Sequence, residues 1–154
     1  MLGQNTTEQT ETVAALRALL TEEAEREALE GALWRAIVAH QGVTFRTATS
    51  LPFCYQVKQG RNGRPTRELL IDRREMSKTL SWSSIRMAFE QALVKRYAAR
   101  PKALGDIRGV SYVYPLLWCF GVIEVPQDTA KRMTLDGQIG FLCEKEEEVC
   151  SFSE

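Results

Sequence analysis

The chain is poor in the residues that most often carry out chemistry in proteins. Among its 154 residues there is one histidine, His40, and there are four cysteines, Cys54, Cys119, Cys143 and Cys150. No two cysteines have the close separation of a structural zinc site, and only Cys143 and Cys150 come near it. We therefore expect ordinary reduced thiols, with Cys54 and Cys119 packed inside, and no metal ion or other cofactor.

Long apolar runs and glycine-rich phosphate loops are also missing. The densest apolar stretch, 110–125, is interrupted by Pro115 and Gly121 and is shorter than the roughly 20 residues that a membrane-spanning helix needs. The segment 1–13 has neither the basic start nor the apolar centre of a secretory signal. No glycine pattern of the P-loop or dinucleotide type occurs. These absences predict a soluble, cytoplasmic protein with no membrane partner.

The sequence favours a non-enzymatic protein over an enzyme. Glu68, Asp72, Glu75 and Lys78 superficially resemble a metal-dependent nuclease site. Such sites often place an acid and a lysine with one residue between them, whereas Glu75 and Lys78 have two residues between them. His40 would be the general base of a nucleophilic mechanism, but a histidine at the end of an amphipathic helix is more often structural or solvated than catalytic. A small nuclease remains a third alternative.

Charge is abundant, balanced in total and uneven along the chain. The 20 Lys+Arg residues equal the 20 Asp+Glu residues, so the net charge is zero. Residues 1–30 nevertheless carry a net charge of −5, residues 31–108 carry +10 and residues 109–154 carry −5. A basic segment between two acidic ones indicates a polyanionic partner, or segments that neutralise one another.

Hydrophobic periodicity predicts an α+β fold in which helices cover a small sheet. Helical spacing of apolar residues marks four segments: 10–20, 22–41, the stretch between a Ser81 N-cap and Pro101, and 111–120. Alternating apolar residues predict strands over 53–57 and 68–72, preceded by a strand over 43–48. The order α-α-β-β-β-α-α implies a three-stranded antiparallel meander, followed by a weak C-terminal hairpin over 134–143.

The same patterns set the expected domain limits and some local contacts. We expect a disordered N-terminus over 1–9, a single α+β domain over 10–126 and a weakly structured acidic tail over 127–154. Thr21 is the expected N-cap of the helix over 22–41. Arg86 and Glu90, four residues apart, are expected to pair across one helical turn.

The α-β-β-β-α order over 22–98 resembles, in topology only, the double-stranded-RNA-binding domain. That family carries a lysine cluster at the start of its last helix. Here the first turn of that helix, 82–85, reads Trp-Ser-Ser-Ile and contains no lysine. The resemblance therefore extends to the order of elements and not to the binding residues.

Two basic segments are candidates for binding an anion. Around the predicted turn at 60–65, guanidinium groups and glycines suit phosphate oxygens. Just before Ser81, two arginines, a lysine and several hydroxyls precede a helix N-terminus, which also favours anions. Trp82 could offer a stacking face there, and Trp34 widens the buried stripe of the helix over 22–41. The alternatives are a solvated turn, and a Ser81 that only caps its helix while Trp82 packs on the core. The candidate nucleic-acid-binding residues are Arg61, Arg64, Arg67, Arg73, Arg74 and Lys78.

We interpret these segments as a surface for nucleic acid or another polyanion. Phosphate contacts would dominate such binding, so the affinity should fall steeply with salt. The alternative is a protein-interaction or assembly module in which the acidic helices pair with the basic segment, within one chain or between copies.

Overall fold

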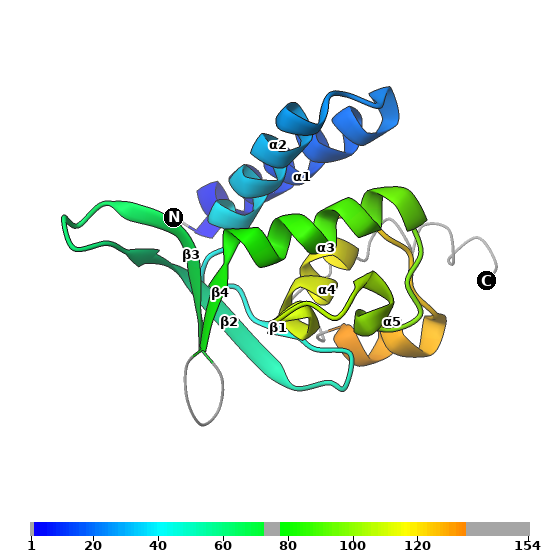
Figure 1. The fold of residues 1–154 in the computed structure, drawn as a ribbon. Helices are drawn as coiled ribbons and strands as arrows, with labels where there is room; N and C mark the ends of the chain where they lie inside the picture. Colours follow the sequence, from blue (N-terminus) through cyan, green and yellow to red (C-terminus); the bar gives the residue numbers. More distant parts are fainter. Residues whose placement is uncertain (1, 73–77, 135–154) are drawn as a thin grey trace.

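The chain folds into an antiparallel sheet with helices against one of its faces (Figure 1). In the computed structural model, residues 2–72 and 78–134 are described, and they form an α+β fold as predicted. The elements follow in the order α1 (Leu2–Glu22), α2 (Arg26–Ala39), β1 (Phe45–Arg46), β2 (Pro52–Gln59), β3 (Pro65–Asp72), β4 (Lys78–Ser81), α3 (Trp82–Lys95), the 3-10 helix η1 (Pro101–Leu104), α4 (Val110–Cys119) and α5 (Gln127–Met133).

The sheet has four strands where the sequence predicted three. Its order is β1-β2-β3-β4, with every pair antiparallel. The predicted strand over 43–48 is reduced to β1, and β4 is an addition that pairs Leu80 with Leu69 of β3. With β4 present, the α-β-β-β-α order that resembled the double-stranded-RNA-binding domain does not hold.

Alternation along the strands separates a buried face from an exposed one. The inward-facing side chains of β2, β3 and β4 are buried, while neighbours such as Gln56, Leu70 and Thr79 are exposed. The buried set consists of Phe53, Tyr55, Val57, Leu69, Ile71 and Leu80. This face packs into the same apolar core as α2, α3 and α4.

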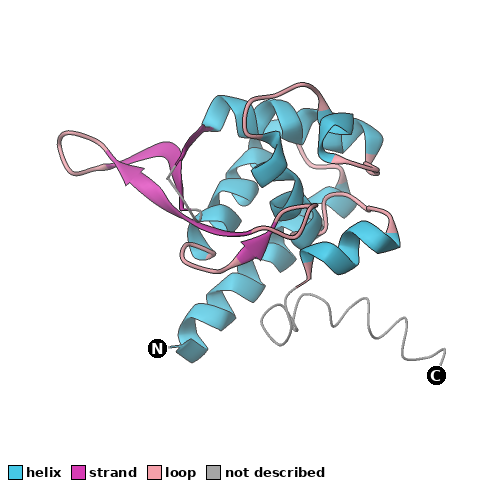
Figure 2. Cartoon of the chain, turned by 90° about the horizontal axis from the view of Figure 1, so that it is seen from below, coloured by secondary structure: helices cyan, strands magenta, loops and turns pink. Residues whose placement is uncertain are grey.

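The hairpin formed by β2 and β3 extends away from the body (Figure 2). Its register shifts between Val57 and Gln59, so that three residues of β3, 66–68, lie opposite Lys58. Thr66 Oγ1 donates to the Lys58 carbonyl at 2.8 Å, and the Lys58 ammonium lies 3.7 Å from the Glu68 carboxylate. These contacts hold the irregular part of the ladder together.

The two N-terminal helices differ from the prediction at their ends. α1 begins at Leu2, inside the segment that was expected to be disordered, and continues to Glu22. Thr21 therefore lies in the last turn of α1, where its hydroxyl donates to the Arg17 carbonyl at 3.0 Å. The prediction of Thr21 as an N-cap is wrong, and Glu25 precedes α2 instead.

The C-terminal half confirms the two predicted helices, α3 and α4, and adds η1 and α5. α4 is buried along almost its whole length, as its apolar sequence predicts. α5 follows residue 126, where the domain was expected to end, and its Met133 is buried. Arg132 Nε donates to the Ala48 carbonyl at 2.8 Å, which attaches α5 to the loop after β1. The predicted hairpin over 134–143 and most of the acidic tail lie outside the described residues.

Several polar groups in the core are bonded to nearby backbone, whereas His40 Nε2 is buried with no hydrogen-bond partner among the described residues. The Tyr55 hydroxyl donates to the Ile37 carbonyl at 2.6 Å, and the Tyr114 hydroxyl donates to the Ala98 carbonyl at 2.6 Å. His40 is completely buried, with Nδ1 2.8 Å from the Ala36 carbonyl and its ring 4.9 Å from that of Phe120. His40 is therefore a core residue that closes the end of α2, and of the two roles expected for it, structural or solvated, its burial excludes the solvated one.

Candidate functional site

The structure divides the six predicted binding residues into separate groups. Arg61 and Arg64 lie in the turn of the β2–β3 hairpin and are exposed. Arg67 lies on β3 and Lys78 is the first residue of β4. Arg73 and Arg74 lie outside the described residues. Among the described candidates, Arg61, Arg64 and Arg67 are exposed and Lys78 is half-buried, and Arg61 and Arg64 lie together in the turn.

Backbone contacts shape the hairpin tip. The Gly60 amide donates to the Arg64 carbonyl at 2.7 Å, and the Gly63 amide donates to the Gly60 carbonyl at 3.0 Å. Asn62 Oδ1 accepts from the Arg64 amide at 3.0 Å. No described acidic side chain pairs with Arg61 or Arg64. The turn therefore holds its shape without the two guanidinium groups, which stay available to a ligand.

Arg67 has a different environment from the tip arginines. It lies two residues before Leu69, on the side of β3 that faces the helices. Its guanidinium carbon is 5.0 Å from the ring centroid of Trp34 on α2 and 5.2 Å from that of Trp82 on α3. The two indoles meet edge to face, with centroids 5.2 Å apart and planes at 74°. Such distances allow cation–π attraction to both rings.

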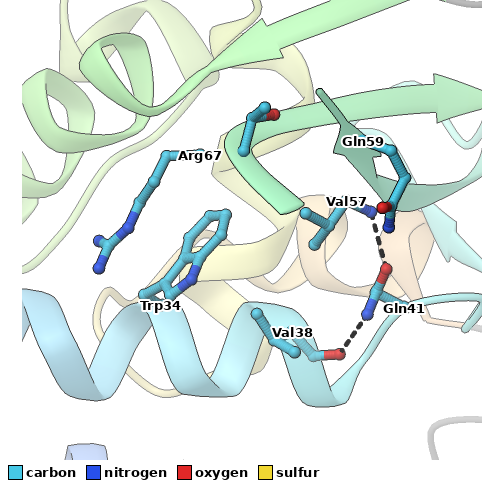
Figure 3. A pocket seen from close by; sticks show the side chains of 7 residues that line it. Trp34, Val38, Gln41, Val57, Gln59 and Arg67 are labelled. Atoms are coloured by element: carbon cyan, nitrogen blue, oxygen red, sulfur yellow. Dashed lines mark hydrogen bonds between the residues drawn. The ribbon is translucent and has the colours of Figure 1, made fainter. Parts of the chain in front are cut away.

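A shallow groove of about 260 Å³ opens beside Trp34, between α2 and the base of the hairpin. Figure 3 shows the Trp34 ring between the Arg67 guanidinium on one side and Val38 and Val57 on the other. Gln41 closes one end, because its Oε1 accepts from the Val57 amide at 2.7 Å and its Nε2 donates to the Val38 carbonyl at 3.2 Å. The groove is lined by Trp34, Val38, Gln41, Val57, Gln59, Thr66 and Arg67.

From the sequence, Trp82 is expected either to pack on the core or to offer a stacking face, and Trp34 is expected to widen a buried stripe. Both are half-buried in the structure, and neither was connected with Arg67. The available signal was the strand period, which puts Arg67 on the same face as Leu69 and Ile71. That period places Arg67 on the face next to the helices, where its guanidinium reaches the two indoles although the residue stays exposed.

The acidic helices do not pair with the hairpin within the described residues. Glu30 of α2 lies 3.5 Å from Arg86 of α3, and Arg26 of α2 lies 2.9 Å from Glu90 of α3. The expected pair of Arg86 with Glu90 is therefore wrong, because each side chain reaches a partner on α2 instead. These contacts join α2 to α3.

At the N-terminus of α3, a free backbone amide already has a hydrogen-bond acceptor from the helix's own N-cap. Ser81 Oγ accepts from the Ser84 amide at 3.2 Å, which confirms Ser81 as the N-cap. Lys78 lies three residues earlier and is opposite Ile71, on the inward face at the edge of the sheet, where it is half-buried. Nothing in this arrangement adds a binding group to the helix end.

The described acids, histidine and cysteines do not form a site for metal or thiol chemistry. Within residues 2–72 and 78–134, no three His, Cys, Asp or Glu side chains are placed to hold a metal ion. Glu68 of the nuclease-like group pairs with Lys58. Cys119 is buried as predicted, whereas Cys54 is only half-buried. Burial and the nearby Asp72 carboxylate raise the pKa of the Cys54 thiol, which disfavours its reactive thiolate.

No helix within the described part of the chain is long and apolar enough to cross a membrane. Comparison with protein-family models, with curated proteins and with solved structures finds no match.

Proposed function

We propose that the protein binds nucleic acid or another polyanion through the tip of its β2–β3 hairpin. The observation that supports this most is the exposure of Arg61 and Arg64 on a projecting turn, unpaired with any described acid. Planar guanidinium groups bind phosphate oxygens in a two-pronged geometry. A β-hairpin that stands clear of the body can follow a phosphate backbone or enter a groove.

Lys58, the other base near the tip, contributes less to this surface. Its ammonium group already forms an ion pair with the Glu68 carboxylate across the strands, so the Glu68 charge offsets the Lys58 charge. Arg67 is held by the two indoles rather than presented at the tip. The binding energy should therefore depend mainly on Arg61 and Arg64, with Lys78, Arg73 and Arg74 as further candidates.

The test is a polarisation titration with labelled DNA and RNA probes at two salt concentrations. The double variant Arg61→Gln/Arg64→Gln should weaken binding at low salt. It should also reduce the slope of log K against log salt by about 2 on duplex DNA, because each phosphate contact contributes about 0.9. The control, Arg100→Gln/Lys102→Gln, removes the same charge from two exposed residues at η1. Equal losses in both variants would indicate attraction by net charge and would contradict a hairpin site.

A second candidate function is assembly between copies of the chain. Four exposed acids, Glu22, Glu23, Glu25 and Glu27, lie around the α1–α2 connection and pair with no described base. Figure 1 places this connection at the far end of the helix pair from the hairpin tip. The two surfaces therefore cannot meet within one chain, but the acids of one copy can meet the arginines of the next in a head-to-tail contact.

Light scattering at low and high salt tests this second candidate. Assembly through these charges predicts oligomers that dissociate as salt is added, and no binding of nucleic acid. A monomer at both salt concentrations would eliminate it.

A further inference from the structure

The groove beside Trp34 combines an aromatic wall, an apolar floor and a polar rim. Val38 and Val57 form the floor, and the Gln59 side chain and Arg67 lie along the rim (Figure 3). Gln41 is committed to the backbone, as described above, so it shapes the groove and is not free to recognise a ligand. A volume of about 260 Å³ is below the about 300–1,000 Å³ of sites for drug-sized molecules. The space therefore suits one planar ring and is too small for a large cofactor.

Arg67 joins this groove to the charged tip. Its guanidinium faces are near the two indoles, but no described residue accepts a hydrogen bond from its N–H groups. These edges can bind an anion while the rings hold the group in position. Arg67 follows Arg64 by three positions, which is about 10 Å along an extended chain. An anionic chain that contacts the tip can therefore continue to Arg67.

We propose that the groove takes one unstacked base of a single-stranded nucleic acid, with the base against the side of Trp34 that faces Val38 and Val57. The adjoining phosphates would contact Arg67 and then the hairpin tip. This inference rests on the proposed function, which it narrows from any polyanion to single strands. Basic grooves with aromatic walls bind single strands in this way, because every base has a face that stacks.

A duplex fits this groove poorly. Its bases are stacked and paired, so entry of a base requires that it first be extruded from the helix. Hairpin-tip contacts to phosphate carry no such requirement, because a duplex and a single strand both present phosphates. The groove therefore predicts a preference for single strands that the tip alone does not produce.

The experiment compares a labelled single-stranded oligonucleotide with the same sequence annealed as a duplex, at low salt. Two neutral variants change the groove: Trp34→Leu removes the aromatic wall, and Val38→Gln partly fills the space while leaving Trp34 in place. Thermal unfolding checks that each is folded, and Val38→Gln carries the test if Trp34→Leu is not. Each folded variant should bind the single strand about 10-fold more weakly, within the range for stacking one base. Duplex binding should change less than about twofold.

The control variant Arg61→Gln/Arg64→Gln separates this inference from the proposed function. It should weaken both probes, because it removes phosphate contacts. If the groove variants bind the single strand like the unaltered protein, or weaken both probes equally, the groove inference is wrong while the hairpin proposal stands. If the unaltered protein binds neither probe at low salt, both proposals are wrong.

Discussion

The guanidinium carbon of Arg67 lies 5.0 Å from the ring centroid of Trp34, so a residue of the projecting hairpin is held by a residue of the second helix. Trp82, the first residue of α3, supplies a second ring at 5.2 Å. One cation thus connects the base of the hairpin to both helices that flank it.

Replacing Arg67 should therefore lower the stability of the fold. Arg67→Gln removes attraction to two half-exposed rings, and each such contact is worth about 0.5–1 kcal/mol. We expect the free energy of unfolding, measured by urea denaturation, to fall by about 1 kcal/mol. Arg64→Gln makes the same chemical change at an exposed turn and should cost less than about 0.5 kcal/mol. Equal costs at the two positions would show that the rings do not hold Arg67.

The ion pair between Arg26 and Glu90 should contribute only a little to stability. Both side chains are close to half exposed, and such pairs typically contribute about 0–1 kcal/mol. The single variants Arg26→Glu and Glu90→Arg should each destabilise, because like charges then meet. The double variant should recover most of the loss. Urea denaturation at low and high salt measures this recovery, which should shrink with salt. A double variant as unstable as the two changes added together would show no coupling between α2 and α3 at this point.

His40 should make the protein less stable in mild acid. Its burial lowers the pKa of the imidazole below 6.5, despite the opposing effect of the Ala36 carbonyl. The unfolded chain therefore binds a proton at a higher pH than the folded chain. Stability is fully present above about pH 6.5, falls as the pH drops below it and stops falling below the lowered pKa of the folded state.

The measurement for His40 is the melting temperature between pH 7.5 and 5.5. The unaltered protein should lose stability by at most about 1.4 kcal/mol per pH unit from this group. His40→Gln keeps a donor for the Ala36 carbonyl but does not titrate, so its stability should vary less over the same range. Parallel pH profiles for the two proteins would assign the acid sensitivity to other groups.

Gly109 and Gly63 have almost the same backbone conformation and very different surroundings. Their φ angles are +80° and +77°, so alanine at either position incurs a similar conformational cost of about 1–2 kcal/mol. A Cβ at Gly109 would lie 2.5 Å from Leu80 Cδ1 in the core, whereas a Cβ at Gly63 meets nothing within 4 Å. Gly109→Ala should therefore destabilise by a further 1–3 kcal/mol or so, the usual cost of overpacking. Equal losses in urea denaturation would contradict the packing of β4 against the start of α4.

Local sequence patterns predicted the elements whose apolar residues repeat regularly. The i, i+3, i+4 spacing in α3 and the alternation in β2 and β3 lead directly to those elements. β4 was missed because a four-residue strand with one apolar inward residue, Leu80, has no pattern of its own. It forms because Leu80 lies opposite Leu69, a contact that depends on the tertiary fold. Competition between partners explains the error at Arg86 and Glu90, since α2 brings Glu30 and Arg26 within reach.

Only the charged turn residues of the candidate site could be predicted from the sequence. The exposed turn residues Arg61 and Arg64 follow from turn-forming neighbours that are local in sequence. The groove requires Trp34, Val57 and Arg67, which come from three elements that only the fold brings together. Arg67 was grouped with the tip because it is near Arg64 in sequence, although the strand period turns it toward the helices.

The most direct test of the central claim is the affinity of a labelled single-stranded oligonucleotide at low and high salt, measured for three proteins. These are the unaltered chain, Arg61→Gln/Arg64→Gln and the charge-matched control Arg100→Gln/Lys102→Gln. Binding through the hairpin predicts an affinity that falls steeply with salt and is reduced more by the hairpin variant than by the control. Absence of binding at low salt, or equal affinities for the two variants, would contradict the account.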